Sequence, residues 1–283
     1  MEDFSFVDET IDLNRAHSYR LSIQLSLNGF SFSILDQVRG KFVALKHIPL
    51  EKESTDDQKG DQIQEIFNSD DCLNVDYKKV LLLFVSPRSV LIPSSYFKQK
   101  DIIQYFKFNY DLRELEEIHF NYIPGIEAYN IFSLPNPISN VILRKFNNAG
   151  FYHQGLPIID FNINNTPVNH NTYSLLSLYE NFFDIGVLYR DRLLLYNSFD
   201  WLSYEDVLYY LLYAYKQLNL DAKENELYVT GDLESRKELK RIIRMYFKKV
   251  HFQKPPSQFT YSYTFKKDKS NYFTNLFRLN LCV

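Results

Sequence analysis

Apolar and polar side chains alternate along the first structured stretch of this 283-residue chain. The run YRLSIQLSL, from Tyr19 to Leu27, places an apolar residue at every second position, which is the pattern of a half-buried β-strand. The runs FSFSILD and FVALKHIPL follow it closely. Asn28-Gly29 between the first two runs favours a tight hairpin, because both residues tolerate positive φ. We therefore expect a three-stranded antiparallel meander.

A second meander is predicted far along the chain, and it repeats the first. The segment Thr172 to Leu188, TYSLLSLYENFFDIGVL, can be laid without a gap over Tyr19 to Leu35. In both copies a strand-like run meets an Asn and is followed by a strand that begins with aromatic residues. The run RLLLYNSF completes the second meander. This weak duplication predicts that one supersecondary unit is used twice.

The segments after each meander also match. In the first copy a polar loop over 51–59 precedes a short amphipathic helix within 61–71 and a buried strand over 80–85. In the second copy Ser203 and Asp206 form a capping-box pattern that opens a long helix. A buried strand ending at Gly231, a helix over 235–249 and a short strand over 250–252 follow. Both copies read as βββαβα.

The first copy carries an insertion. We expect a hairpin around Pro124-Gly125, a helix within 136–149 with Pro137 near its start and Gly150 beyond its end, and LPIIDFNIN, residues 156–164, as the strand that returns to the sheet. FTYSYTF at 259–265 alternates like a strand, and the last residues predict a closing amphipathic helix. The predicted organisation is an N-terminal tail over 1–16, a first half over 17–165 and a second half over 166–283.

Composition narrows the classes of function. The chain has 22 Tyr and 24 Phe but only 8 Gly, so few positions allow the backbone to approach a phosphate closely. The two cysteines, Cys72 and Cys282, are too few for a disulfide framework, and no apolar run is long enough to cross a membrane. With an acidic N-terminus unlike a secretory signal, these features predict a cytoplasmic protein without a membrane span.

The order of elements resembles a known superfamily. A βββαβα unit used twice, with an insertion in the first copy, is similar to the actin-like ATPase superfamily of sugar kinases, chaperones, actins and pilus-assembly actin homologues. The segment from Phe6 to Asp36 also looks like the opening of a bacterial family of unknown function, of the kind found in Bacteroidetes. The resemblance covers nearly the whole chain. It implies an α/β, actin-like ATPase fold of two ribonuclease-H-like halves, and by itself no function.

The resemblance also indicates where nucleotide would bind. Each half of such a protein normally ends its first strand with an Asp-x-Gly turn, in which the Asp acts through Mg²⁺ and the Gly exposes backbone N–H groups to phosphate. The matching positions here are Gln24 and Ser26 in the first half, and Ser177 and Tyr179 in the second. None is a carboxylate or a glycine. The resemblance therefore implies a degenerate site without a cofactor, with ATP and Mg²⁺ as the less favoured alternative.

The superfamily's adenosine motif, a Gly-Gly pair, corresponds here to Gly231-Asp232. A carboxylate at the second position would repel phosphate, although Gly231 alone also suits the entry to a helix. If the chain is an ATPase or kinase, its metal site would be rebuilt from carboxylates near strand ends. The alternative is that Asp184 lies on a solvated strand face and Asp191 shapes a hairpin turn. The carboxylates considered for the rebuilt site are Asp36, Asp160 and Asp184.

No other catalytic motif is found, since the six His residues are scattered and no GxGxxG, GxSxG or HExxH pattern occurs. The remaining feature is a basic helix near the C-terminus, where residues 221–283 carry 13 Lys and Arg against 7 Asp and Glu. It is either the solvated outer face of the fold or a patch for nucleic acid or another partner. Its candidate residues are Arg236, Lys237, Lys240, Arg241 and Arg244.

Three hypotheses follow, in order of preference. The first is a non-catalytic actin-like scaffold that binds another protein through its cleft or basic end. The second is an ATP-binding enzyme with a rebuilt metal site. The third is an accessory protein that binds nucleic acid through the basic helix.

Overall fold

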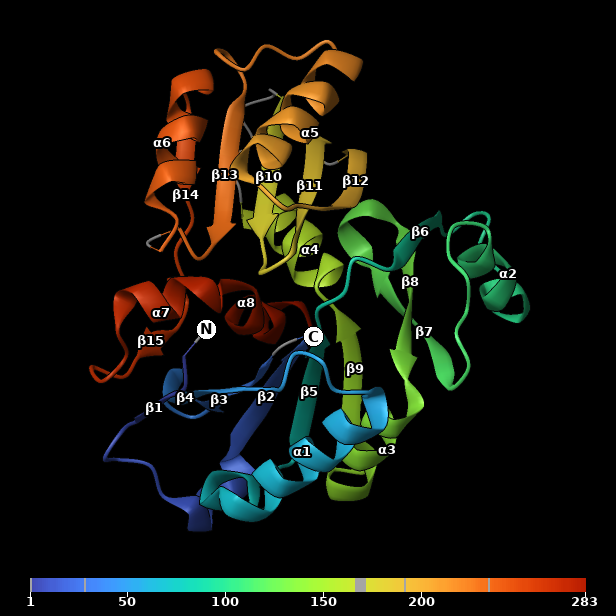
Figure 1. The fold of residues 1–283 in the computed structure, drawn as a ribbon. Helices are drawn as coiled ribbons and strands as arrows, with labels where there is room; N and C mark the ends of the chain where they lie inside the picture. Colours follow the sequence, from blue (N-terminus) through green and yellow to red (C-terminus); the bar gives the residue numbers. More distant parts are fainter. Residues whose placement is uncertain (1, 28, 166–171, 191, 234) are drawn as a thin grey trace.

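The computed structural model describes residues 2–27, 29–165, 172–190, 192–233 and 235–283 (Figure 1). Two halves, each with its own sheet, lie one above the other in Figure 1, and a third, smaller sheet forms a lobe beside the first half. Within the described ranges, no helix is both long and apolar enough to span a membrane.

The first sheet has the strand order β1-β4-β3-β2-β5-β9, and β15 pairs with β4 beside β1. β2, β3 and β4 form the expected antiparallel meander, while β5 and β9 run parallel to β2. The strands of this sheet are β1 (Phe4–Val7), β2 (Tyr19–Ser26), β3 (Gly29–Asp36), β4 (Lys41–Pro49), β5 (Lys79–Phe84), β9 (Ala149–His153) and β15 (Thr260–Tyr261).

The second sheet repeats the first. Its order is β12-β11-β10-β13-β14, the order of the first sheet without β1 and β15. The register is also kept, since Leu25 pairs with Phe30 as Leu178 pairs with Phe183. The duplication predicted from the sequence is therefore confirmed. The strands are β10 (Thr172–Leu178), β11 (Phe182–Tyr189), β12 (Arg192–Asp200), β13 (Glu226–Gly231) and β14 (Val250–Phe252).

The helices form three layers around these two sheets. α1 and α3 pack on the outer face of the first sheet, α5 and α6 on the outer face of the second, and α4 and α8 lie between the sheets (Figure 1). The helices are α1 (Asp56–Ser69), α2 (Ile102–Lys107), α3 (Asn136–Lys145), α4 (Gly155–Asn165), α5 (Tyr204–Gln217), α6 (Lys237–Tyr246), α7 (Lys267–Tyr272) and α8 (Thr274–Cys282).

The insertion forms the lobe on the right of Figure 1, in which β6, β7, β8 and α2 lie. Its sheet has the order β6-β8-β7. The Asn121 side chain fastens the lobe to β9, because it donates to the Phe151 carbonyl at 2.8 Å and accepts from the His153 N–H at 2.8 Å. The hairpin predicted around Pro124-Gly125 is thus confirmed as β7 and β8. The strands are β6 (Ser89–Pro93), β7 (Glu116–Ile123) and β8 (Ala128–Pro135).

One predicted strand is a helix. Residues 156–164, expected to return to the sheet, belong to α4, and the strand beside β5 is β9. α4 lies between the two halves, so most of its side chains are buried on all sides. A helix buried all round has no polar face, and its apolar run therefore looks like that of a buried strand.

Three further boundaries differ from the prediction. The expected tail over 1–16 contains β1, which pairs with β4, and the expected loop over 51–59 contains the start of α1. Gly29 belongs to β3 and pairs with Ser26, so it is not a loop residue as expected, and Asn28 lies outside the described residues. Glycine suits position 29 because a Cβ there would lie 2.5 Å from the His47 ring.

Candidate functional site

The two turns that correspond to the expected phosphate loops both lie at the junction of the halves. The first joins β2 to β3 and the second joins β10 to β11. Lys52, just after β4, reaches across to Glu180 of the second turn with 3.3 Å between Nζ and Oε1. Ser26 of the first turn and Phe182 of the second line one pocket. The structure therefore brings these two candidate regions together, as the resemblance implied.

Tyr179 is packed into the core between the halves. Its ring stacks on Phe182 with 4.6 Å between centroids, and its hydroxyl accepts a hydrogen bond from Asn275 of α8 at 3.3 Å. Its N–H donates to the Phe182 carbonyl at 3.0 Å. Burial raises the pKa of the Tyr179 hydroxyl well above its usual value. The ring thus belongs to the hydrophobic core, and the backbone N–H that a phosphate would use is bonded within the turn.

The other candidate positions of the second half are also occupied by internal contacts. Ser177 is buried and accepts from the Thr230 hydroxyl at 2.8 Å. Gly231 has φ of +110°, and a Cβ there would lie 2.4 Å from the Leu178 carbonyl oxygen. Glycine is therefore required by the contact between β13 and β10. The Asp232 carboxylate accepts hydrogen bonds from Ser235 just before α6.

In the first half, Gln24 is buried on the face of β2 that also carries Ser22. Ser22 accepts from Asn280 of α8 at 3.0 Å, so this face of the sheet is turned toward the central helices. Ser26 ends β2, and its hydroxyl donates to the Gly29 carbonyl at 3.3 Å. At these two positions, as at Ser177 and Tyr179, the side chains are neutral and offer no carboxylate to a metal ion.

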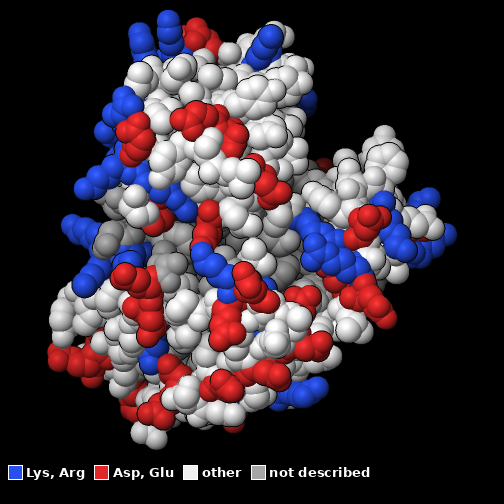
Figure 2. All heavy atoms as spheres, in the orientation of Figure 1, with Lys and Arg blue, Asp and Glu red and all other residues white. Residues whose placement is uncertain are grey.

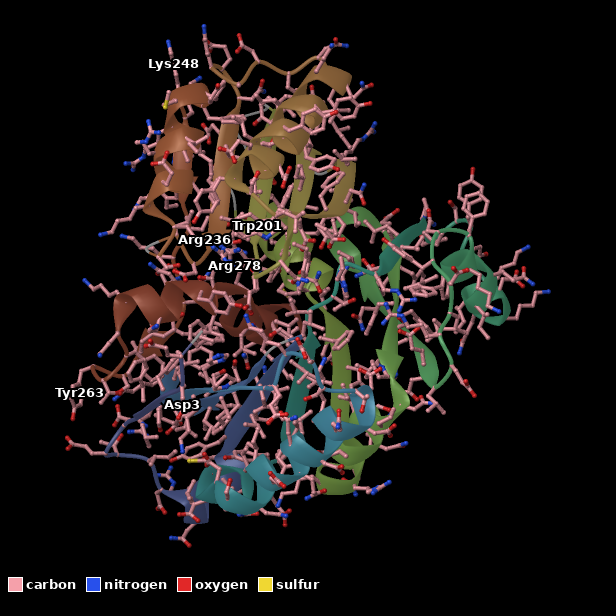
Figure 3. The ribbon with its side chains drawn as sticks, viewed as in Figure 1. Asp3, Trp201, Arg236, Lys248, Tyr263 and Arg278 are labelled. Atoms are coloured by element: carbon pink, nitrogen blue, oxygen red, sulfur yellow. The ribbon has the colours of Figure 1, made fainter. Side chains whose placement is uncertain are left out.

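Arg236 closes the second turn from the side of α6. Its Nη2 donates to the Tyr179 carbonyl at 2.9 Å, and its guanidinium lies 4.9 Å from the Trp201 ring centroid. Figure 3 shows Arg236 and Trp201 at the junction, with Arg278 of α8 below them. Arg278 is almost fully buried against Phe161, and burial lowers its pKa to about 9. Arg236, expected on a surface patch, is therefore partly a structural residue.

Asp184 is buried, so the expectation that it lies on a solvated strand face is wrong. Its carboxyl group accepts from Ser198 Oγ at 2.5 Å, from the Tyr196 hydroxyl at 3.0 Å and from Gln154 Nε2 at 3.4 Å. Burial raises the pKa of Asp184 to about 7, against these hydrogen bonds, which lower it. The group is therefore close to half protonated at neutral pH, and its oxygens are already occupied by three hydrogen bonds from within the protein.

The remaining carboxylates do not join Asp184. Asp160 of α4 accepts from the Gly125 N–H at 3.3 Å, and Asp36 ends β3 at the end opposite the turn, where it pairs with Arg39 at 2.6 Å. Within the ranges that the structure covers, no three His, Cys, Asp or Glu side chains are placed to hold a metal ion. Asp191, expected in a hairpin turn, lies outside those ranges.

The basic helix is confirmed as α6, and its charges differ in their surroundings. Lys240 and Arg244 lie over the Phe252 ring, 5.0 and 4.9 Å from its centroid, while Arg241 pairs with Glu238 at 2.5 Å. Figure 2 shows Lys and Arg along the left edge, over α6 and α7. We call this surface the basic edge. It comprises Lys237, Lys240, Arg241, Arg244, Lys266, Lys267 and Lys269.

The sequence did not indicate two groups that the structure brings into the junction. Lys59, within the expected polar loop, is buried and lines the pocket between the two turns. His153 ends β9 and Gln154 follows it, and both side chains donate to the Ser86 carbonyl, at 2.8 and 2.7 Å. Burial lowers the pKa of His153 to about 4, so its ring is neutral. No spacing rule would have found these residues, because tertiary contacts alone assemble them.

Solved structures with a similar fold support the architecture. A Bacteroides thetaiotaomicron protein, described as having an actin-like ATPase fold and unknown function, superposes with a TM-score of 0.83 and 25% identity, over 97% of this chain and 100% of that one. A PilM–PilN type IV pilus biogenesis complex matches with a TM-score of 0.57 and 10% identity, over 93% of this chain and 97% of that one. No curated protein matches the sequence.

The expected fold is therefore confirmed as actin-like, with two ribonuclease-H-like halves and a lobe inserted in the first. A family model described as "Protein of unknown function (DUF3822)" matches residues 8–250, which is most of the chain. The protein belongs to this family, DUF3822.

Proposed function

We propose that this chain is a non-catalytic binding protein, an actin-like body that contacts a protein partner and does not hydrolyse ATP. The observation that carries this proposal is the packing of Tyr179. The position that would need a glycine beside phosphate holds a ring stacked on Phe182 and bonded to α8. Residues in this arrangement do not fit Mg-ATP held at Asp-x-Gly turns. The expected cytoplasmic location is part of the same proposal.

A second support comes from the fold itself. One protein with this fold was solved as part of a pilus biogenesis complex of PilM with PilN, so an actin-like body can take part in a protein assembly. Here the turns are bonded internally and α8 fills the space between the sheets. Such a closed body suits binding to a partner better than cycles of opening around a nucleotide.

Calorimetric titration with Mg-ATP, together with a phosphate-release assay, tests the proposal. We expect no saturable heat and no release above background. The same assays on Asp184→Asn address the alternative enzyme, because Asp184 is the best placed of the carboxylates for a rebuilt site. Micromolar binding of Mg-ATP with turnover that Asp184→Asn abolishes would overturn the proposal in favour of an ATPase or kinase.

The basic edge favours a second candidate, binding of nucleic acid. Its lysines and arginines extend from α6 to α7 along one side of the molecule (Figure 2). Such a surface would attract phosphates, and the affinity would fall steeply with salt. The test is fluorescence anisotropy with a labelled duplex at several salt concentrations. Reversal of Lys240, Arg241 and Arg244 to Glu should abolish binding, whereas the same reversal of Lys98, Lys100 and Lys107 on the lobe should not. Equal affinity in both triple variants would exclude this candidate.

A further inference from the structure

A pocket of about 230 Å³ lies where the first half, the inserted lobe and the second half meet, and we call it the junction pocket. The end of β2, the start of α1 and the loop after β5 contribute from the first half. Glu116 of β7 and Ser133 of β8 contribute from the lobe, and Asn181 from the turn before β11. A ligand in this pocket would therefore touch all three parts of the molecule.

Lys59 is the buried cation of the junction pocket. Only 6% of its surface is exposed, yet its Nζ is not among the fully buried polar atoms and no described residue pairs with it, so the ammonium group keeps its solvent contact at the pocket. An ammonium group in this setting keeps only part of its hydration, and a negative group beside it would add a favourable charge-assisted contact. The pocket is the place where a negative group would supply that partner.

The backbone holds Lys59 in a fixed position. α1 begins with a capping box, in which Gln58 accepts from the Thr55 N–H at 2.8 Å and donates its own N–H to the Thr55 hydroxyl at 3.3 Å. The next residue, Gly60, allows α1 to approach α3, since a Cβ there would lie 3.4 Å from the Pro137 carbonyl oxygen. Lys59 is thus positioned by a capped and closely packed helix before any ligand arrives.

Arg88, another cation of the pocket, already has partners among its neighbours. Arg88 pairs with Glu116, donates to the Asp111 carbonyl, and lies 5.3 Å from the Phe106 ring centroid. The lining contains Lys59, Arg88 and Arg113 against Asp56 and Glu116, which is three positive groups and two negative ones. A ligand group with one negative charge would balance this lining.

Size and polarity narrow the ligand further. A volume of about 230 Å³ is below the roughly 300–1,000 Å³ of pockets that bind drug-sized molecules. Leu25, Phe84 and Phe182 add apolar surface beside the charged groups. A single carboxylate on a short apolar stem fits these properties better than a phosphate ester, which would bring close to two negative charges.

We propose that the junction pocket binds a carboxylate group, with Lys59 as its ion-pair partner. The inference rests on the proposed function, because it assigns the acidic side chain or chain end that a partner protein would present. Lys59 would donate charge-assisted hydrogen bonds to the carboxylate, and bonds of this kind contribute more than neutral ones.

The test uses propionate as the probe, followed by ¹H–¹⁵N NMR at constant ionic strength with sodium chloride as the balancing salt. We expect saturable shifts of the amide signals of Ser26, Lys59 and Ser86. Propionamide, which has nearly the same shape without the charge, should cause none. Lys59→Met should weaken propionate binding tenfold or more, while Lys59→Arg should keep it within about threefold. Lys216→Met, an exposed lysine on α5, is the matched control and should bind as the unchanged chain does.

A folded Lys59→Met variant is expected, because Met keeps the length and the apolar stem of the largely buried side chain. Equal propionate affinity in Lys59→Met and the unchanged chain would overturn the inference. Tighter binding of inorganic phosphate than of propionate would overturn the choice of carboxylate. Mg-ATP binding of equal strength in the unchanged chain and in Lys59→Met would overturn the proposed function but not the inference about the junction pocket. The two failures can thus be told apart.

Discussion

Two buried titratable residues near the junction have opposite effects on stability. The carboxyl group of Asp184 has its pKa raised to about 7, and the ring of His153 has its pKa lowered to about 4, both because of burial. Between pH 4 and 7 the folded chain keeps a proton on Asp184 that the unfolded chain releases, so this group favours folding less as pH rises. His153 acts in the other direction, since the unfolded chain gains a proton there as pH falls below about 6.5.

Asp184→Asn should therefore change the pH dependence of stability. The Asn is neutral at every pH, so the unfolding free energy of the variant rises relative to that of the unchanged chain as pH increases from 4 to 7. The gain reaches at most about 4 kcal/mol, the equivalent of three pKa units. The His153 contribution is common to both proteins and largely cancels in the difference. Urea unfolding of both proteins across this pH range measures the difference in unfolding free energy.

Asp206→Asn is the control for this experiment. Hydrogen bonds from the N–H groups of Leu202 and Ser203 lower the pKa of Asp206, so its contribution is present at neutral pH and lost in acid. The difference from the unchanged chain should then vary with pH in the opposite direction. If the Asp184→Asn curve runs parallel to that of the unchanged chain, Asp184 is ionised in the folded state and the assignment is wrong.

Gly231 is the residue whose role the structure decides most clearly. Gly231→Ala places a Cβ 2.4 Å from the Leu178 carbonyl oxygen, at φ of +110°. Backbone strain and the clash together should cost about 3 kcal/mol of unfolding free energy. Gly40 is the matched control, since its φ is +59° and nothing lies within 4 Å of an added Cβ. Gly40→Ala should cost about 1 kcal/mol. Equal losses in denaturant unfolding would contradict the packing argument.

At the scale of elements, the helix starts depend on capping. Ser203 and Asp206 predicted the start of α5, and the Asp206 carboxylate indeed accepts from the Ser203 N–H at 2.9 Å. The equivalent Thr55 and Gln58 pattern at α1 stands among polar residues, where the sequence predicts a loop. The first buried residues of α1, Lys59 and Gly60, are not apolar markers of a helix, so the apolar period indicates α1 only from Ile63 onward.

The cap of α1 predicts a measurable effect. Thr55→Ala removes the hydroxyl that accepts the Gln58 N–H and should lower the unfolding free energy by about 1 kcal/mol. Thr55→Ser keeps a hydroxyl at the same place and should change it much less. Thermal unfolding of the two variants beside the unchanged chain provides the comparison. Equal effects of both substitutions would show that the capping bond does not stabilise α1.

At the scale of the whole molecule, the C-terminal segment joins the two halves. After β14 the chain returns to the first sheet as β15, and α8 then lies between the sheets. Phe277 of α8 packs against Phe42 with 4.6 Å between ring centroids and against Tyr261 with 5.2 Å. The segment assigned by sequence to the second half therefore completes the core of the first as well.

Phe277→Ala should destabilise the whole chain, because the ring is fully buried in the central core. The expected loss is about 3–5 kcal/mol, the usual cost of removing a buried Phe. Phe108→Ala is the control, since Phe108 is 90% exposed on the lobe and should change stability by less than about 0.5 kcal/mol. Circular dichroism and Trp201 fluorescence should report one shared, shifted transition in Phe277→Ala. Separate transitions would mean that the halves are not coupled through α8.

Sequence alone determined the repeated unit and hence the fold, because the period of apolar residues and the turns are local properties that survive in a single chain. The resemblance to the actin-like superfamily also located the four altered turn positions, since it implies an Asp-x-Gly turn at the end of the first strand in each half. The tertiary structure decided what these positions do. α4 could not be recognised as a helix, nor Tyr179 as a core residue, because both are defined by burial between two halves that meet only in the folded chain. The junction pocket depends on the same meeting: Lys59 and Asn181 are far apart in sequence, and long-range packing alone places them around one space.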